Sequence, residues 1–218
     1  MKRSTLDALL AAAADKRAVC RIVDLESGAE RIAAREDAAA SAALDSDRAS
    51  VEDGTFVHPF NPPLRMLIIG AVHVAQILTV MAKELGYAVT VIDPRGAFLR
   101  AERFADVERT DDWPDEALER LAPDHRTAVV LLSHDPKIDD PALAVALKSD
   151  AFYIGALGSK RTHASRTERF EARGFDAATI GRIHGPIGLD IGAKSPAEIA
   201  TSIVAEITAV LRGRRPSN

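Results

Sequence analysis

A glycine turn and an acidic residue occupy the positions that a nucleotide-binding fold would give them. The stretch Gly70-Ala71-Val72-His73-Val74-Ala75 follows an apolar run at 64–69, and Asp93 ends the next apolar run about 20 residues further on. In such a fold the turn lets a helix N-terminus approach a phosphate, and the acid binds ribose hydroxyls. Val72 stands at the second glycine position, where a side chain obstructs backbone contact with a pyrophosphate. The pattern therefore indicates the fold more strongly than it indicates bound NAD.

The residues around this turn each allow two interpretations. Gly70 either admits a phosphate or serves only a tight turn. Arg95, shortly after Asp93, either reaches a phosphate or pairs with that carboxylate. His73 lies in the first turn of a predicted helix, where it either contacts a ligand or is a partly buried histidine bonded to the backbone. These choices stay open at the level of sequence.

A second polar group, Ser133-His134-Asp135, follows the apolar run at 127–132. Open α/β sheets bind ligands at the carboxyl ends of their strands, so His134 is a candidate for proton transfer, metal binding or ligand orientation. A zinc site is not predicted, because the sequence has no second histidine or cysteine at close ligand spacing. Asp139 and Asp140, followed by Pro141, are interpreted as the cap of the next helix.

A third group, Gly155-Ala156-Leu157-Gly158-Ser159-Lys160-Arg161, joins the apolar run at 151–156 to a charged helix predicted over 159–173. Small residues, a hydroxyl and two cations at a helix start are suited to hold an anion, with Gly158, Ser159 and Arg161 as candidates. The Walker A pattern is missing, so ATP hydrolysis is not predicted. The basic residues further along this helix are interpreted mainly as a solvated face: His163, Arg166 and Arg169.

The stretch at 182–193 is rich in glycine and yet apolar. Flexible linkers seldom contain so much isoleucine and leucine, so we expect an ordered loop with special backbone angles. Such a loop would deliver His184 and Asp190 beside the last helix. A purely structural role is the alternative.

These groups need an alternation of strands and helices to position them. Strands are predicted at 64–69, 88–92, 106–110, 127–132 and 151–156, with helices at 74–85, 115–121, after Asp139 and at 159–173. The last helix has the clearest start, the capping box Ser195-Pro196-Ala197-Glu198, and an apolar stripe follows it. The predicted fold class is α/β: a Rossmann-like parallel sheet with helices on both faces, over residues 61–218.

The first 60 residues differ, and predict a small N-terminal α+β appendage. A short helix is expected at 4–15, and the Ser27-Gly28 turn places Ile22 and Ile32 on a hairpin. Residues 38–51 show little periodicity and are interpreted as a loosely packed connection. The prolines at 59, 62 and 63 mark a boundary, so the linker is placed at about 38–63.

Composition excludes several classes of function. The chain has 218 residues, a formal net charge of −4 and a single cysteine, Cys20. This charge does not favour nucleic acid as a partner, and a lone cysteine excludes an internal disulfide and suits a reducing compartment. The longest apolar runs are too short for a membrane span. We therefore expect a cytoplasmic protein, with Cys20 as a small core residue.

Together these segments resemble the XdhC/CoxI family, the xanthine dehydrogenase accessory factors. The matching stretches are the glycine turn from Gly70, Val91-Ile92-Asp93-Pro94-Arg95, Tyr153-Ile154-Gly155-Ala156-Leu157-Gly158-Ser159 and Arg182 through Ala193, continued by Ser195-Pro196-Ala197-Glu198-Ile199-Ala200. The resemblance covers about 62–211, and the stretches from Tyr153 and from Arg182 are its most specific parts.

The resemblance implies a carrier without a turnover reaction. It would hold molybdenum cofactor, in its mononucleotide or dinucleotide form, and help to insert it into the apoenzyme of a xanthine dehydrogenase-type or CO dehydrogenase-type hydroxylase. A cysteine desulfurase or a second accessory subunit is a further expected partner. The exposed edge of the predicted sheet, the apolar stripe of the last helix and the short N-terminal part favour a homodimer. No residue is assigned as catalytic or as a metal ligand. The residues expected to form or border the cofactor crevice are Gly70, His73, Asp93, Arg95, His134, Gly158, Ser159, Arg161, His184 and Asp190.

Two features depart from the family pattern. Val72 replaces a glycine that is common in the family, and the short N-terminal part lacks the Gly-Gly-Cys stretch of longer members. Two other functions stay open: an NAD- or NADP-dependent oxidoreductase, and a nucleotide-sensing module without catalysis. Against the oxidoreductase, the sequence has no Tyr-x-x-x-Lys pair.

Overall fold

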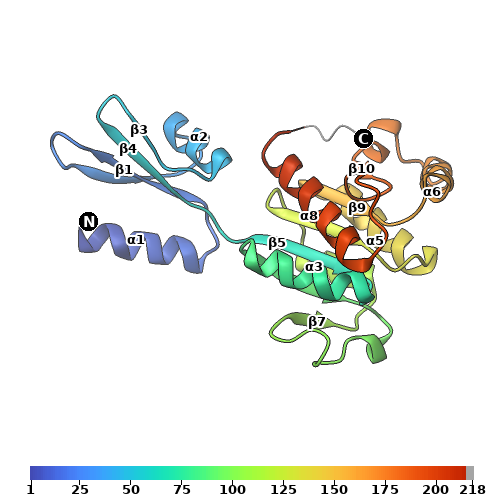
Figure 1. Ribbon diagram of the computed structural model, residues 1–218. Coiled ribbons are helices and arrows are strands. Elements are labelled where there is room, and N and C mark those ends of the chain that lie inside the picture. The colour runs from blue at the N-terminus through green and yellow to red at the C-terminus, as the bar shows by residue number, and fades with distance from the viewer. Residues whose placement is uncertain (215–218) are drawn as a thin grey trace. The chain divides into compact units, whose positions relative to one another are not determined.

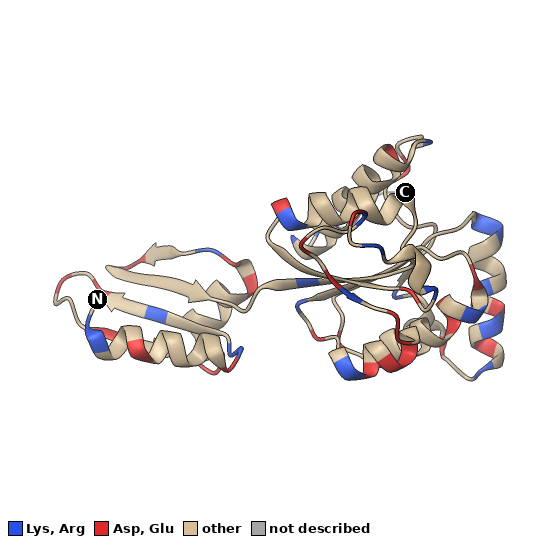
Figure 2. Ribbon diagram, turned by 90° about the horizontal axis from the view of Figure 1, so that it is seen from below, with Lys and Arg blue, Asp and Glu red and all other residues tan. Residues whose placement is uncertain are grey.

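The computed structural model describes residues 1–214, and the chain divides into two compact units between Pro62 and Pro63 (Figure 1). None of the helices in this range is long and apolar enough to cross a membrane. Basic and acidic residues are interspersed along the ribbon of each unit (Figure 2), in keeping with the small net charge.

The N-terminal unit is an antiparallel sheet with two helices. Its sheet has the strand order β2-β1-β4-β3. The predicted hairpin is confirmed, because β1 and β2 pair with Arg21 opposite Ile32. The elements are α1 (Arg3–Ala14), β1 (Val19–Asp24), β2 (Glu30–Ala33), α2 (Ala38–Ser46), β3 (Ser50–Glu52) and β4 (Thr55–Phe60).

The prediction of a loose connection at 38–51 is wrong. The Asp37 side chain caps α2 by accepting hydrogen bonds from the backbone N–H groups of Ala39 and Ala40, both at 3.1 Å. Ala40 and Leu44 are buried against Cys20, which has no exposed surface, as predicted for a core residue. Alanine makes a weak hydrophobic stripe, so this short amphipathic helix shows little periodicity in sequence although its small side chains allow close packing.

Pro59 lies inside β4, within the segment at about 38–63 that was interpreted as a linker. It pairs with Cys20 of β1, whereas β3 pairs with β4 only as far as Val57. Pro59 therefore has a neighbouring strand on one side only, a position that tolerates a missing backbone N–H.

The second unit confirms the predicted Rossmann-like sheet. All six strands are parallel, in the order β10-β9-β8-β5-β6-β7. The chain moves outward from β5 in one direction and resumes at β8 on the other side, so the topological switch lies between these two strands. The strands are β5 (Leu64–Ile69), β6 (Tyr87–Ile92), β7 (Glu108–Thr110), β8 (Thr127–Leu131), β9 (Tyr153–Ala156) and β10 (Ile183–His184).

Helices cover both faces of this sheet. Met66 and Ile68 of β5 enter one hydrophobic layer, while Leu67 and Ile69 enter the other, as the alternation of side chains along a strand requires. The first layer contains α3 (His73–Glu84) and α8 (Pro196–Leu211), which lie together in Figure 1. The second layer contains residues of α4 (Pro114–Leu121), α5 (Pro136–Lys148), α6 (Lys160–Ala172) and α7 (Ala177–Ile180), and a short 3-10 turn, Gly96–Phe98, follows β6.

The predicted start of α5 is wrong. The helix begins at Pro136, and the Asp135 side chain caps it by accepting a hydrogen bond from the Lys137 N–H at 2.9 Å. Asp135-Pro136 has the same cap-then-proline pattern as Asp140-Pro141, and it lies at the end of the strand where the chain must turn. Pro141 is therefore inside the helix, and Asp139 faces the interior instead of capping.

Candidate functional site

The main cleft lies at the carboxyl ends of β5, β8 and β9 and has a volume of about 540 Å³. This edge is where open α/β sheets bind ligands, next to the topological switch. Three segments and one helix line the cleft: Val72, His73 and Val74 from the glycine turn, His134 after β8, Leu157, Gly158, Ser159 and Thr162 after β9, and Ile199 of α8.

Gly70 serves the packing of the glycine turn and does not line the cleft. Its φ is +101°, in the region that favours glycine. A Cβ atom at this position would lie 2.7 Å from the backbone nitrogen of Ser133. The turn can therefore pass the end of β8 only because residue 70 has no side chain.

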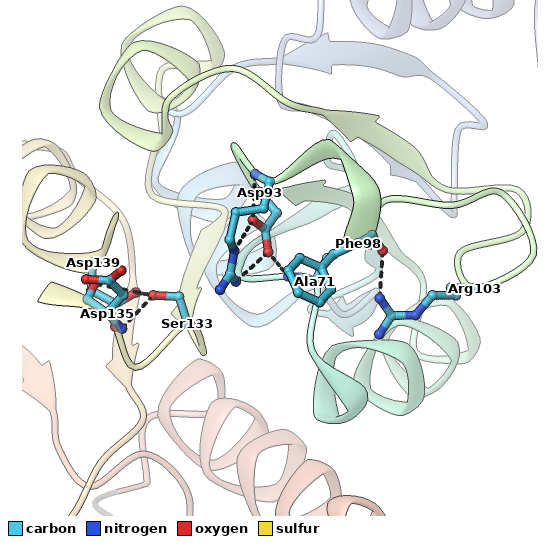
Figure 3. A network of polar contacts seen from close by, with 8 residues as sticks. Ala71, Asp93, Phe98, Arg103, Ser133, Asp135 and Asp139 are labelled. Carbon is cyan, nitrogen blue, oxygen red and sulfur yellow. Dashed lines mark hydrogen bonds and ion pairs between the residues drawn. The ribbon is translucent and has the colours of Figure 1, made fainter. Parts of the chain in front are cut away.

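Asp93 is engaged by its own protein. The fully buried carboxylate accepts hydrogen bonds from Arg95 Nε and Nη2, both at 2.8 Å, and from the Ala71 N–H at 2.8 Å (Figure 3). Burial raises the pKa of this carboxyl, but the bonds from Arg95 and Ala71 outweigh it and hold the pKa below its ordinary value. Of the two interpretations of Arg95, the structure shows the ion pair with Asp93.

Two helix N-termini point at the main cleft. The α3 helix follows Val72, which provides no side-chain cap, so its first-turn N–H groups lack a capping partner at this end. The α6 helix is capped by Ser159, whose hydroxyl accepts a hydrogen bond from the Thr162 N–H at 3.1 Å. Such N-termini attract anions. His73 is exposed at the start of α3, so the interpretation as a partly buried histidine is wrong.

His134 is exposed and has a φ of +62°, which is uncommon for a residue with a side chain. The neighbouring Ser133 donates a hydrogen bond from its hydroxyl to the Asp139 carboxylate at 2.6 Å (Figure 3). His134 thus projects from a tight turn that is held to α5 by Ser133, and it lines both the main cleft and a smaller pocket beside it.

A second hollow, of about 350 Å³, is formed by the glycine-rich loop at 185–193 against α8. Asp190 lines it, and Leu157 and Ile199 line both this hollow and the main cleft. The predicted order of this loop has a simple cause at Gly188, where a Cβ atom would lie 2.4 Å from Ser202 Oγ. The loop can therefore pack closely against α8.

His184 lies in a buried network beside this loop. Its ring stacks on Tyr153 at a centroid distance of 4.5 Å, and its Nδ1 lies 3.2 Å from Glu206 Oε1. The Tyr153 hydroxyl and the Gly188 N–H donate to the other oxygen of Glu206, at 2.5 Å and 2.8 Å. The sequence interpretation missed Glu206, although Ser202 and Glu206 are polar residues one helical turn apart inside an apolar helix.

A third hollow, of about 240 Å³, lies between α5 and α6. Arg161 lines it, as do Asp139, Asp140 and Arg169. The interpretation of the basic residues as a solvated face is wrong for Arg166, which also lines this pocket and is only 3% exposed. Arg169 forms a two-point ion pair with Asp140, at 2.7 Å and 2.9 Å.

The candidate residues therefore divide into two sets. His73, His134, Gly158 and Ser159 line the main cleft, with Asp190 and Arg161 in the adjoining hollows. The others have structural partners: Gly70, Asp93, Arg95 and His184. In the described part of the chain, three or more His, Cys, Asp or Glu side chains do not gather in a group that could hold a metal ion.

Residues 66–207 match the family model described as the XdhC Rossmann domain. The chain is 30% identical over 151 residues to the molybdenum cofactor insertion chaperone PaoD of Escherichia coli strain K12, covering 69% of this chain and 41% of that protein. It is 29% identical over 153 residues to a protein of Bacillus subtilis strain 168 described as a probable xanthine dehydrogenase subunit, covering 70% and 44%. The chain thus spans less than half the length of these relatives.

A crystal structure described as a xanthine dehydrogenase from Bacillus halodurans has a similar fold. The TM-score is 0.74 at 24% sequence identity, with 98% of this chain and 65% of that chain covered. The likeness includes residues of both units, and it concerns the fold alone.

Proposed function

This chain belongs to the XdhC family, and from that premise we propose that it binds molybdenum cofactor as cargo and helps to insert it into the apoenzyme of a molybdenum hydroxylase. The relative PaoD is named as a chaperone for insertion of this cofactor. The proposed role is that of a carrier without a turnover reaction of its own.

The engagement of Asp93 is the observation that carries this proposal. A dinucleotide-binding protein that holds NAD uses the acid at this position for ribose hydroxyls. Here both carboxylate oxygens accept hydrogen bonds from Arg95, and one also accepts from Ala71. Binding NAD in the usual pose would take the buried Asp93 carboxylate away from Arg95, and Val72 would also obstruct the pyrophosphate. The cleft favours a ligand held in another way.

The groups that line the cleft fit a ligand with an anionic end and a polar ring system. The uncapped first turn of α3 and the start of α6 offer N–H groups and the Ser159 hydroxyl. His73 and His134 provide exposed ring nitrogens that can bond a pterin. Asp190 and the glycine-rich loop line the second hollow, which adjoins the main cleft.

The proposed partner is an enzyme that needs the molybdenum cofactor. We propose a hydroxylase apoenzyme of the xanthine dehydrogenase or CO dehydrogenase type, and a homodimer of this chain. A cysteine desulfurase or a second accessory subunit is proposed as a further partner, because Cys20 is a poor candidate for handling sulfur. The Cys20 thiol is buried, and its pKa is raised first by burial and then by the charge of Asp37. A buried thiol of this kind is poorly suited to carry sulfur itself.

Anaerobic calorimetric titration of the full chain with molybdenum cofactor, NAD and NADP tests the proposal. We expect tight binding of the molybdenum cofactor, weakened about tenfold by His73→Ala or Ser159→Ala, because each removes a group that lines the cleft. His125→Ala is the matched control, since His125 is exposed just before β8, at the amino edge of the sheet. Binding of NAD or NADP alone would favour the oxidoreductase or the sensor instead.

A further inference from the structure

The pocket between α5 and α6 contains a buried cation that the protein does not fully bond. Arg166 is 3% exposed, and its Nη2 donates to the Leu157 carbonyl at 3.1 Å. Its Nε and Nη1 are buried and have no hydrogen-bond partner among residues 1–214. An unbonded buried guanidinium N–H is costly, so such groups in native proteins usually have a partner or a function.

Neither nearby carboxylate is hydrogen-bonded to this guanidinium, although the charges of both act on it. Asp140 is bonded at both oxygens by Arg169. Asp139 accepts from Ser133, and it forms no ion pair with Arg166 within 4.0 Å in the described residues. Burial raises the pKa of Asp139, with Ser133 and Arg166 only partly opposing it, so this group holds its proton to higher pH than an ordinary aspartate.

The rest of the pocket is also suited to an anion. Arg161 is exposed and forms no ion pair within the described chain, and Thr162 and Ser165 also line the pocket. The pocket therefore has three guanidinium groups and only two carboxyl groups. One of the two carboxyl groups, that of Asp140, is already paired with Arg169. Arginine forks match the oxygen geometry of a phosphoryl group.

The pocket adjoins the main cleft, because His134 and Thr162 line both. We propose that the pocket between α5 and α6 binds a phosphoryl oxyanion through Arg166 and Arg161. Resting on the proposed function, this oxyanion is the phosphate of the molybdenum cofactor, whose ring system then lies in the main cleft. Free inorganic phosphate is the other source of the same chemistry.

The test measures binding of inorganic phosphate and pyrophosphate to the full chain, by calorimetry and by thermal shift in a phosphate-free buffer. We expect both anions to bind and to raise the Tm, and Arg166→Met to weaken binding at least tenfold. Arg173→Met is the matched control: it removes one positive charge from the exposed end of the same helix, and we expect it to bind as the wild type does.

A second variant keeps the test decisive if Arg166→Met does not fold. Arg161 is exposed, so Arg161→Met leaves the core intact, and we expect it to weaken phosphate binding severalfold relative to Arg173→Met. Equal affinities in the Arg161 and Arg173 variants, or in the Arg166 and Arg173 variants, would overturn the proposal.

Competition separates the two proposals. If molybdenum cofactor binds and pyrophosphate displaces it only where Arg166 is present, the phosphate of the cofactor occupies the pocket. If the cofactor binds with the same affinity in the wild type and in Arg166→Met, the assignment of the pocket fails while the carrier function stands. If the cofactor does not bind but phosphate binding still depends on Arg166, the carrier function fails and the pocket is a site for free phosphate.

Discussion

Glu206 is a buried carboxylate of α8 that is bonded by residues of β9 and of the glycine-rich loop. It has no exposed surface, and it accepts hydrogen bonds from Tyr153 and Gly188 while facing His184. Burial raises the pKa of its carboxyl, but the bonds from His184, Tyr153 and Gly188 outweigh this effect, so the pKa lies below the ordinary value. The network ties the glycine-rich loop and β10 to α8, and with them one wall of the hollow that contains Asp190.

We predict that Glu206→Gln destabilises the protein by about 2 kcal/mol at pH 7, because a neutral amide replaces a buried carboxylate that is bonded by Tyr153 and Gly188 and contacts His184. Because the pKa of Glu206 is lowered in the native state, its carboxylate contributes its full share of the unfolding free energy above the unfolded pKa of about 4.3. That contribution is lost as the pH falls through the native pKa. The difference in unfolding free energy between wild type and variant should therefore shrink below about pH 4. Urea unfolding across this pH range measures it.

The exposed Glu171 on α6 provides the control for this comparison. Glu171→Gln should change the unfolding free energy by less than about 0.5 kcal/mol at pH 7. An equally small effect of Glu206→Gln would show that the buried carboxylate does not hold the loop to the helix.

At the scale of elements, the turn between β5 and α3 has to satisfy two constraints. It must reverse direction with a left-handed residue, and it must pass the backbone of Ser133 at the end of β8. The same close approach places the Ala71 N–H against Asp93, so the turn, β6 and β8 are positioned together. Strain at this turn would therefore reach the main cleft.

We predict that Gly70→Ala destabilises the protein by about 3 kcal/mol, through the left-handed φ and the contact with Ser133. Gly86→Ala is the matched control: Gly86 also has a positive φ, +82°, but a Cβ atom there would meet nothing within 4 Å. It should cost only about 1 kcal/mol. Thermal unfolding of both variants separates the cost of the backbone angle from the cost of the close approach, and equal losses would contradict the second cause.

At the scale of the whole molecule, each hydrophobic cluster of the described residues belongs to one unit. The two large clusters draw on residues from Leu64 onward, and the two small ones on residues before Pro59. A unit with its own core can fold by itself. The candidate cleft and both adjoining hollows are lined by residues of the second unit alone.

We predict that a fragment from Pro63 to Asn218 folds cooperatively and binds the same ligands as the full chain. Circular dichroism during heating should show a single transition, and calorimetry should give a phosphate affinity within about threefold of the full chain, since no residue of the pocket is removed. An unfolded fragment would show that the second unit depends on the first.

The sequence by itself determined the fold class, because that class follows from local signals. Apolar runs at 64–69 and 127–132 became β5 and β8, Ser195 forms the capping box of α8, and the candidate residues at strand ends lie along the carboxyl edge of the sheet. These features depend on propensity, capping and alternation, which each segment carries within itself.

Only the tertiary structure decided which of those residues are available to a ligand. Asp93 accepts a hydrogen bond from the Ala71 N–H because the parallel pairing of β5 and β6 brings the end of β6 to the glycine turn, and Asp139 faces inward because Asp135 holds the capping position. Arg166, in a helix of strongly polar composition, is buried because α6 packs against α5. Burial and pairing between distant segments are properties of packing, and the order of residues along one segment does not contain them.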